Sequence, residues 1–134
     1  MRQPPGLRVF QANVGRGSAS HDLALQIAYE AGHHLILIQE PWTQLKPGRR
    51  QTKAHPAYKT FIPIDDWAIR PRVLTYLRQD VGYQVSQPTY NLSRDLLQIV
   101  LYLPDRRAKY DIWNVYNGPA GSTDAGLGLA TLLR

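Results

Sequence analysis

The carboxylate of Glu40 stands directly after the most apolar run of the chain. Residues Leu35–Ile38 are all aliphatic, which is typical of a strand that is buried on both faces. Pro41 has no backbone N–H and biases Glu40 toward an extended backbone, so we expect the strand to end there. Ligands bind beyond the carboxyl ends of strands in open α/β sheets. Glu40, next to the ring of Trp42, is therefore the first candidate for chemistry, and a solvated strand end is the alternative.

Two other expected strands also end in polar side chains. Asn13 ends a strand predicted over 7–13, and Tyr116 and Asn117 end a strand predicted over 110–116. If the first of these lies parallel to the strand before Glu40, Asn13 and Glu40 open onto the same rim. An oxygen-rich rim suits Mg²⁺, which often binds through one or two carboxylates, waters and substrate phosphates. The alternatives are a turn residue for Asn13 and simple sheet packing for Tyr116.

Composition limits the class of protein. The 134 residues suit one domain, and 43% hydrophobic residues suffice for a core. The sequence contains no cysteine, which excludes a structural disulfide and a thiolate zinc site. We see neither a signal peptide nor a bilayer-spanning run, so we expect an intracellular protein with no membrane partner. The formal charge of +6 and the high arginine content suggest a polyanionic partner, with a solubilising surface as the alternative.

The elements that must position these residues begin with a strand–helix–strand unit. Gly15 to Ser18 is predicted as a loop, and Ser18 or Ser20 can cap a helix that ends at Gly32. Its buried face is predicted from helical spacing to contain Leu23, Ala24, Ile27, Ala28 and Ala31. After Glu40 we expect a surface loop over 43–56, strands over 58–62, 73–77, 83–85 and 95–103, a hairpin partner over 110–116, and a last helix capped by Ser122 or Thr123.

Taken in order, these segments resemble the start of an endonuclease/exonuclease/phosphatase domain. The closest likeness is to the endonuclease of non-LTR (LINE-type) retrotransposons, especially the fungal kind that precedes a reverse transcriptase. The resemblance covers nearly the whole chain, and its most specific segment is Leu37–Trp42. The other matching segments are 7–16, 70–78, 95–99 and 113–119.

The resemblance implies an α/β (α+β) fold, namely the N-terminal half of a four-layer α/β sandwich with a mixed sheet and flanking helices. Residues 1–6 are then a flexible lead-in, and residues 7–134 a partial domain. The implied activity is that of a phosphodiesterase that uses Mg²⁺, with Mn²⁺ as an alternative, and nicks target DNA for retrotransposition. DNA is the implied partner, and a DNA substrate favours the nucleus.

The resemblance also implies roles for particular residues. An Asn at this position contacts the scissile phosphate or orders the site, which here is Asn13. A Glu that ends the next strand binds the metal, which here is Glu40. A Tyr in an aliphatic-Tyr-x-x-Pro motif reaches the phosphate, which here is Tyr116. The residues expected to bind nucleic acid are Arg16, Trp42, Arg72 and Asn117.

Two motifs of the resembled family are absent. The sequence contains no Asp-x-Asn, whose Asp is tied to nucleophile activation, and no Ser-Asp-His, since no His follows His55. We therefore expect a truncated domain that is weakly active or inactive, leaves a sheet face and strand edges exposed, and is marginally stable. Its expected partners are a downstream reverse transcriptase domain or the missing C-terminal half. The alternative is a non-catalytic fragment that acts as a nucleic-acid-binding or protein-interaction module.

Overall fold

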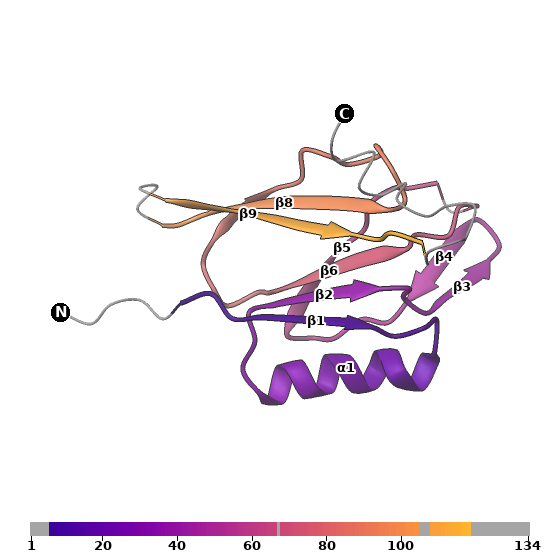
Figure 1. The fold of residues 1–134 in the computed structure, drawn as a ribbon, viewed down its shortest axis with the longest axis horizontal. Helices are drawn as coiled ribbons and strands as arrows, with labels where there is room; N and C mark the ends of the chain where they lie inside the picture. The colour runs from indigo at the N-terminus through magenta and orange to yellow at the C-terminus, as the bar shows by residue number, and fades with distance from the viewer. Residues whose placement is uncertain (1–5, 67, 105–107, 119–134) are drawn as a thin grey trace.

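The computed structural model describes residues 6–66, 68–104 and 108–118, and its architecture is mixed α/β (Figure 1). This confirms the fold class expected from the sequence. The described elements are β1 (Val9–Asn13), α1 (Ser18–Glu30), β2 (Leu35–Gln39), β3 (Thr43–Lys46), β4 (Arg49–Thr52), β5 (Tyr58–Phe61), β6 (Val73–Arg78), β7 (Gln84–Ser86), β8 (Leu96–Tyr102) and β9 (Lys109–Val115). The predicted lead-in, apart from Gly6, and the predicted last helix lie outside the described residues.

The central sheet has the strand order β1-β2-β6-β5. β1 and β2 are parallel neighbours joined by α1, which confirms the predicted strand–helix–strand unit, and Asn13 pairs with Gln39 in their register. β6 is antiparallel to both β2 and β5. The carboxyl ends of β1 and β2 therefore lie at the same edge of the sheet, where the candidate residues were expected.

Helix α1 covers one face of this sheet, but the side of the helix that contacts the sheet differs from the predicted one. The buried residues His21, Ala24, Leu25 and Ala28 follow i, i+3, i+4, i+7 spacing, whereas Leu23 is 60% exposed. The prediction that Leu23, Ile27 and Ala31 face the core is wrong, since all three are exposed, while Ala24 and Ala28 are placed correctly. The small side chains at 24 and 28 let the helix lie close to the sheet, and the buried His21, a polar residue, does not follow the apolar pattern.

Residues 43–52 form a β-hairpin, so the prediction of a surface loop over 43–56 is wrong in this part. β3 and β4 pair antiparallel from Thr43 opposite Thr52 to Lys46 opposite Arg49. The turn between them contains Pro47 and Gly48, and Gly48 takes a φ of 76°, which suits glycine. The hairpin is largely polar and exposed, so it lacks the apolar alternation that identifies a strand in a sequence.

A second sheet, with the order β7-β8-β9, covers the other face of the central sheet. β8 and β9 form the predicted hairpin, within one residue of its expected bounds. Leu97, Ile99 and Leu101 of β8 pack in one cluster with Leu35 of β2 and Val73 of β6. The expectation of an exposed sheet face is therefore wrong for the central sheet, because the β8–β9 hairpin lies within the chain and buries that face.

Asn114 links the two sheets through a buried amide. It is 1% exposed on β9, and its Nδ2 donates to the carbonyl oxygen of Leu74 at 2.8 Å. Its Oδ1 accepts a hydrogen bond from Gln39 Nε2 at 2.6 Å. Because Gln39 immediately precedes Glu40, this contact fixes the end of β2 against the second sheet.

Among the described residues, no helix has the length and apolar character needed to cross a bilayer.

Candidate active site

Glu40 lies just beyond the end of β2, with a backbone conformation that differs from the prediction. Its φ is 50°, in the left-handed region, whereas a residue before proline was expected to be extended. Its N–H donates to the carbonyl oxygen of Arg72 at 2.9 Å, and its own carbonyl oxygen accepts the N–H of Arg16 at 2.8 Å. Both hydrogen bonds come from other segments and hold a conformation that costs about 1–3 kcal/mol for a non-glycine residue. Such strain clusters at functional sites.

Tyr116 reaches Glu40 from the second sheet. Its hydroxyl donates to Glu40 Oε1 at 3.3 Å, and its side chain is almost fully buried. Burial and the negative charge of Glu40 raise the pKa of Tyr116, so the phenol keeps its proton and remains a donor. Two of the predicted site residues, 76 positions apart in the sequence, are thus brought into contact.

The guanidinium of Arg72 packs against the ring of Tyr116. It also makes a bidentate pair with the buried carboxylate of Asp95, with Nη2 2.8 Å from Oδ2. The same guanidinium lies 4.9 Å from the ring centre of Tyr116, and the Tyr116 N–H donates to the Asp95 carbonyl oxygen at 2.9 Å. Arg72 is only 9% exposed, so the structure places this predicted DNA-binding residue in the interior, where it positions Tyr116.

Asn13, the last residue of β1, and Arg16, on the loop that follows, are both exposed near Glu40. Asn13 Oδ1 accepts the N–H of Gly15 at 2.9 Å, which is the turn role that the sequence left open. Arg16 has a φ of 63° and approaches Glu40 through its backbone. Asn117 follows Tyr116 and is exposed. The catalytic role of Asn13 and the DNA contacts of Arg16 and Asn117 stay predictions.

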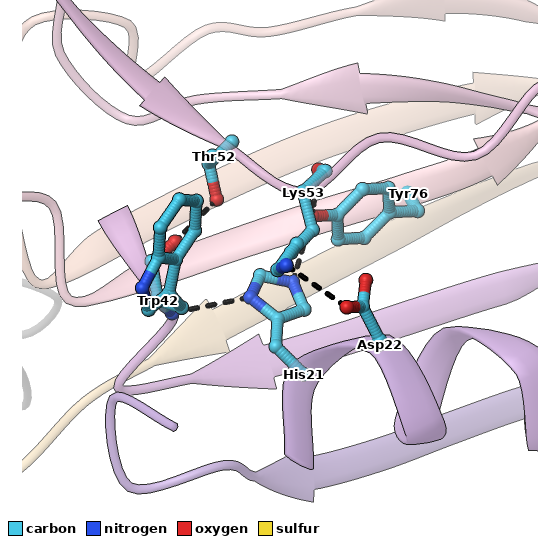
Figure 2. Close-up of polar contacts among 6 residues, drawn as sticks. All are labelled: His21, Asp22, Trp42, Thr52, Lys53 and Tyr76. Carbon is cyan, nitrogen blue, oxygen red and sulfur yellow. Dashed lines mark hydrogen bonds and ion pairs between the residues drawn. The ribbon is translucent and has the colours of Figure 1, made fainter. Parts of the chain in front are cut away.

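Trp42 is fixed by a buried histidine that sequence reasoning missed (Figure 2). His21 Nδ1 accepts the backbone N–H of Trp42 at 3.1 Å, and His21 Nε2 lies 2.9 Å from the hydroxyl of Tyr76. The Tyr76 hydroxyl donates to the Lys53 carbonyl oxygen at 2.7 Å, so it accepts from His21. His21 is therefore neutral with its proton on Nε2, and burial lowers its pKa to about 4.

The end of the β3–β4 hairpin closes over the ring of Trp42 (Figure 2). Lys53 Nζ lies 4.6 Å from the ring centre and 2.8 Å from Asp22 of α1. Thr52 Oγ1 donates to the Trp42 carbonyl oxygen at 2.7 Å. The hairpin and the helix thus both hold the turn that follows Glu40. No local sequence pattern predicts these contacts to Trp42. The one sequence feature that points to them is His21, a polar residue on the face of α1 that otherwise packs in the core.

The donor groups near Glu40 fit a hard cation only in part. Within the part of the chain that the structure describes, no three His, Asp or Glu side chains gather at one point. Glu40 supplies one carboxylate, and the Tyr116 hydroxyl is a neutral oxygen beside it. Mg²⁺ commonly binds to one or two carboxylates, with waters and substrate phosphates as the remaining ligands. One carboxylate with a neutral oxygen beside it does not make a metal site by itself, and a hard cation held there would need water and substrate oxygens as its remaining ligands.

Comparison with solved structures places this geometry in a known fold. The chain is similar to a structure described as the endonuclease domain of TRAS1, a telomere-specific non-LTR retrotransposon, with a TM-score of 0.69 and 16% sequence identity. The match covers 96% of this chain and 52% of that chain, so this chain spans about half the length of its structural neighbour. The fold expected from the resemblance is thereby confirmed. No protein-family model matches the chain, and no curated protein does.

Proposed function

We propose that this chain carries part of the active site of a retroelement-type endonuclease, a phosphodiesterase that nicks DNA. The contact between Glu40 and the Tyr116 hydroxyl carries the proposal, because it places a carboxylate and a phenol donor at one sheet edge. Similarity to the fold of a retrotransposon endonuclease domain supports it. The formal charge of +6 is also suited to a DNA substrate.

Each residue has a distinct task in the proposed site. Glu40 holds a divalent cation, Mg²⁺ or alternatively Mn²⁺, which when bound polarises a phosphoryl oxygen and stabilises the leaving group. When DNA is bound, Tyr116 donates its one hydroxyl proton to a phosphate oxygen instead of to Glu40. Asn13 orders the rim next to Glu40. Arg16, Trp42 and Asn117 face the DNA, whereas Arg72 acts through Tyr116.

The proposed site needs groups that these 134 residues do not contain. The Asp-x-Asn and Ser-Asp-His motifs, which the resemblance ties to nucleophile activation and phosphoryl chemistry, do not occur in the sequence. We propose that residues of a complementary C-terminal half, or of a segment linked to a downstream reverse transcriptase, supply them in an intracellular, nuclear setting. The chain on its own is then expected to nick DNA only slowly.

A plasmid assay tests this proposal. Supercoiled plasmid is incubated with the purified chain and Mg²⁺ or Mn²⁺, and conversion to the nicked circle is followed. We expect slow nicking that falls about 100-fold in Glu40→Gln, because the cation then loses its carboxylate ligand. Glu30→Gln, at the exposed end of α1, is the matched control and is expected to nick as the wild type does. Nicking that is equal in the Glu40→Gln protein overturns the proposal.

The second candidate function is a DNA-binding module without nuclease activity. The excess of arginine over acidic residues and the lack of the two catalytic motifs favour it. It predicts duplex binding that weakens steeply with salt and no nicking with either metal ion.

A further inference from the structure

Arginine residues surround the segment that holds Glu40. The N–H of Arg16 donates to the Glu40 carbonyl oxygen at 2.8 Å, and the Arg72 carbonyl oxygen accepts the Glu40 N–H at 2.9 Å. Arg70 Nη2 donates to the carbonyl oxygen of Pro41 at 2.9 Å. Two loops, one after β1 and one before β6, therefore bring arginines to this segment, and of the three the Arg72 side chain turns inward to Asp95.

The positive charges at this rim lie close enough to act on one another. Burial lowers the pKa of Arg70, and the charges of Arg16, Arg50 and Arg94 lower it further, while Glu40 acts in the opposite direction. The opposing carboxylate is outnumbered, so the rim has a surplus of positive charge around Glu40.

Arg94 is the member with a vacant donor. Its Nε is buried and has no hydrogen-bond partner among the described residues. The neighbouring carboxylate, Asp95, is engaged by Arg72 in a bidentate pair. Arg94 also lines a hollow with Asp65 and Asp66, but the charges that act on its guanidinium are those of Arg72, Asp95, Arg16 and Tyr116. Because Asp95 is already paired, the Arg94 guanidinium, which the charges of Arg72 and Arg16 repel, is suited to an anionic oxygen.

We infer that Arg16, Arg70 and Arg94 form a phosphodiester site at the rim of Glu40 that is complete without metal. DNA then binds without needing the cation, and the cation binds tightly only once DNA is in place. This inference rests on the proposed function, since it gives the order in which that site is filled.

The order in which DNA and the cation bind follows from the charges around Glu40 and from the number of ligands that a divalent cation needs. In the free protein a divalent cation at Glu40 meets one carboxylate and several guanidinium groups, which repel it. A bound phosphodiester neutralises part of this positive charge and adds the oxygen ligands that one carboxylate leaves lacking. Phosphate and cation therefore bind cooperatively, and each strengthens the other equally.

Binding without metal is measured first. A fluorescein-labelled DNA duplex is titrated with the full chain in EDTA over a salt series, with anisotropy as the readout. We expect measurable binding, a roughly tenfold loss of affinity in Arg94→Gln, and a salt slope lower by about 1, as expected for one phosphate contact. Arg16→Gln, changed at an exposed side chain, is expected to show the same reduction without any effect on folding.

The matched control is Arg8→Gln, which removes one exposed arginine just before β1, at the opposite end of that strand from Asn13. Its affinity is expected to stay within about twofold of the wild type, since long-range charge alone is screened by salt. If Arg8→Gln and Arg16→Gln lose the same amount of DNA affinity, the duplex binds to the overall positive charge of the chain and the proposed site is overturned.

Cation binding is measured second, from the electron paramagnetic resonance signal of free Mn²⁺ with and without duplex, and a gel afterwards shows that the duplex stayed intact. We expect Mn²⁺ binding to be at least about tenfold tighter with DNA, an increase that is absent in Glu40→Gln. Equally tight Mn²⁺ binding without DNA, or DNA binding that requires metal, overturns the inference. Metal-independent binding without any nicking overturns the proposed nuclease instead, so the two failures are distinguishable.

Discussion

At the scale of single residues, the position of the Glu40 side chain depends on a series of side-chain contacts that begins at the buried Asp95. Asp95 pairs with Arg72, whose guanidinium lies against the ring of Tyr116, and the Tyr116 hydroxyl contacts Glu40. The side chains of Arg72 and Asp95 are 11% and 6% exposed. A buried pair of this kind contributes little net stability compared with apolar residues, but it fixes the direction of the groups that it touches.

Breaking this pair is expected to be costly, because one charge is then buried without its partner. We predict that Arg72→Met lowers the free energy of unfolding by about 3–5 kcal/mol, measured by urea denaturation at pH 7. The double variant Arg72→Met/Asp95→Leu is expected to recover most of this loss.

Arg78→Met is the control for this experiment, since it breaks the Arg78–Asp80 pair, whose Asp80 side chain is 66% exposed. It is expected to leave the unfolding curve unchanged. A double variant as unstable as the single one contradicts the explanation by unpaired charge.

At the scale of the elements, α1 and the β3–β4 hairpin together hold the turn after β2. His21 accepts the Trp42 N–H, and Lys53 at the hairpin end pairs with Asp22 and lies over the Trp42 ring. Figure 1 shows the hairpin at the end of the sheet where β1 and β2 finish. The helix thus does more than cover the sheet, because its His21 anchors the segment that presents Glu40.

This anchor is expected to make stability depend on pH. His21 has a pKa of about 4 in the folded chain and about 6.5 when unfolded, so the unfolded state binds more protons in between. The contribution of the neutral, buried His21 to the free energy of unfolding is complete above pH 6.5 and declines as the pH falls toward 4. Urea denaturation at pH 7, 5.5 and 4.5 measures this decline.

In His21→Gln, which cannot titrate, we expect lower stability at pH 7 and a smaller loss on acidification than in the wild type. Parallel pH dependence of the two proteins contradicts the assignment of a neutral, buried His21.

At the scale of the whole molecule, both faces of the central sheet are covered, while β1 and β9 each pair with only one other strand among the described residues. α1 buries one face and the second sheet buries the other, so β2 is buried throughout. β1 is an outer strand of the described central sheet, and β9 is an outer strand of the second sheet. An open edge beside an exposed aromatic residue favours association between chains. Trp113 on β9 is such a residue, with 39% of its surface exposed.

We expect the chain on its own to be marginally stable and to self-associate, with light scattering that rises with protein concentration. Trp113→Lys is predicted to reduce this scattering strongly without lowering the melting temperature, because a lysine at an edge opposes pairing. Leu23→Lys on α1 is the control, since Leu23 is exposed but lies away from strand edges. A sharp, concentration-independent melt of a monomeric wild type contradicts this expectation.

Local sequence patterns were sufficient for the elements that carry the candidate site. The apolar run before Glu40 predicted β2, alternation predicted β1, and two runs of strand-forming residues joined by a turn predicted β8 and β9. Burial on one or both faces of a strand is visible in the sequence as such patterns. The same patterns placed Asn13, Glu40 and Tyr116 at strand ends. They failed for the β3–β4 hairpin, whose side chains are mostly polar and solvated, so that turn chemistry and pairing rather than burial define it.

The sequence by itself determined the strand–helix–strand unit and the polar residues that end its strands, since both depend on neighbours a few positions away. Only the tertiary structure decided that Glu40 takes a left-handed backbone, that Arg72 turns inward to Asp95, and that His21 binds the Trp42 backbone. Each of these outcomes depends on hydrogen bonds and burial between segments 20 or more positions apart. Local propensity contains no information about such contacts, because they form only when the sheets and the helix pack together.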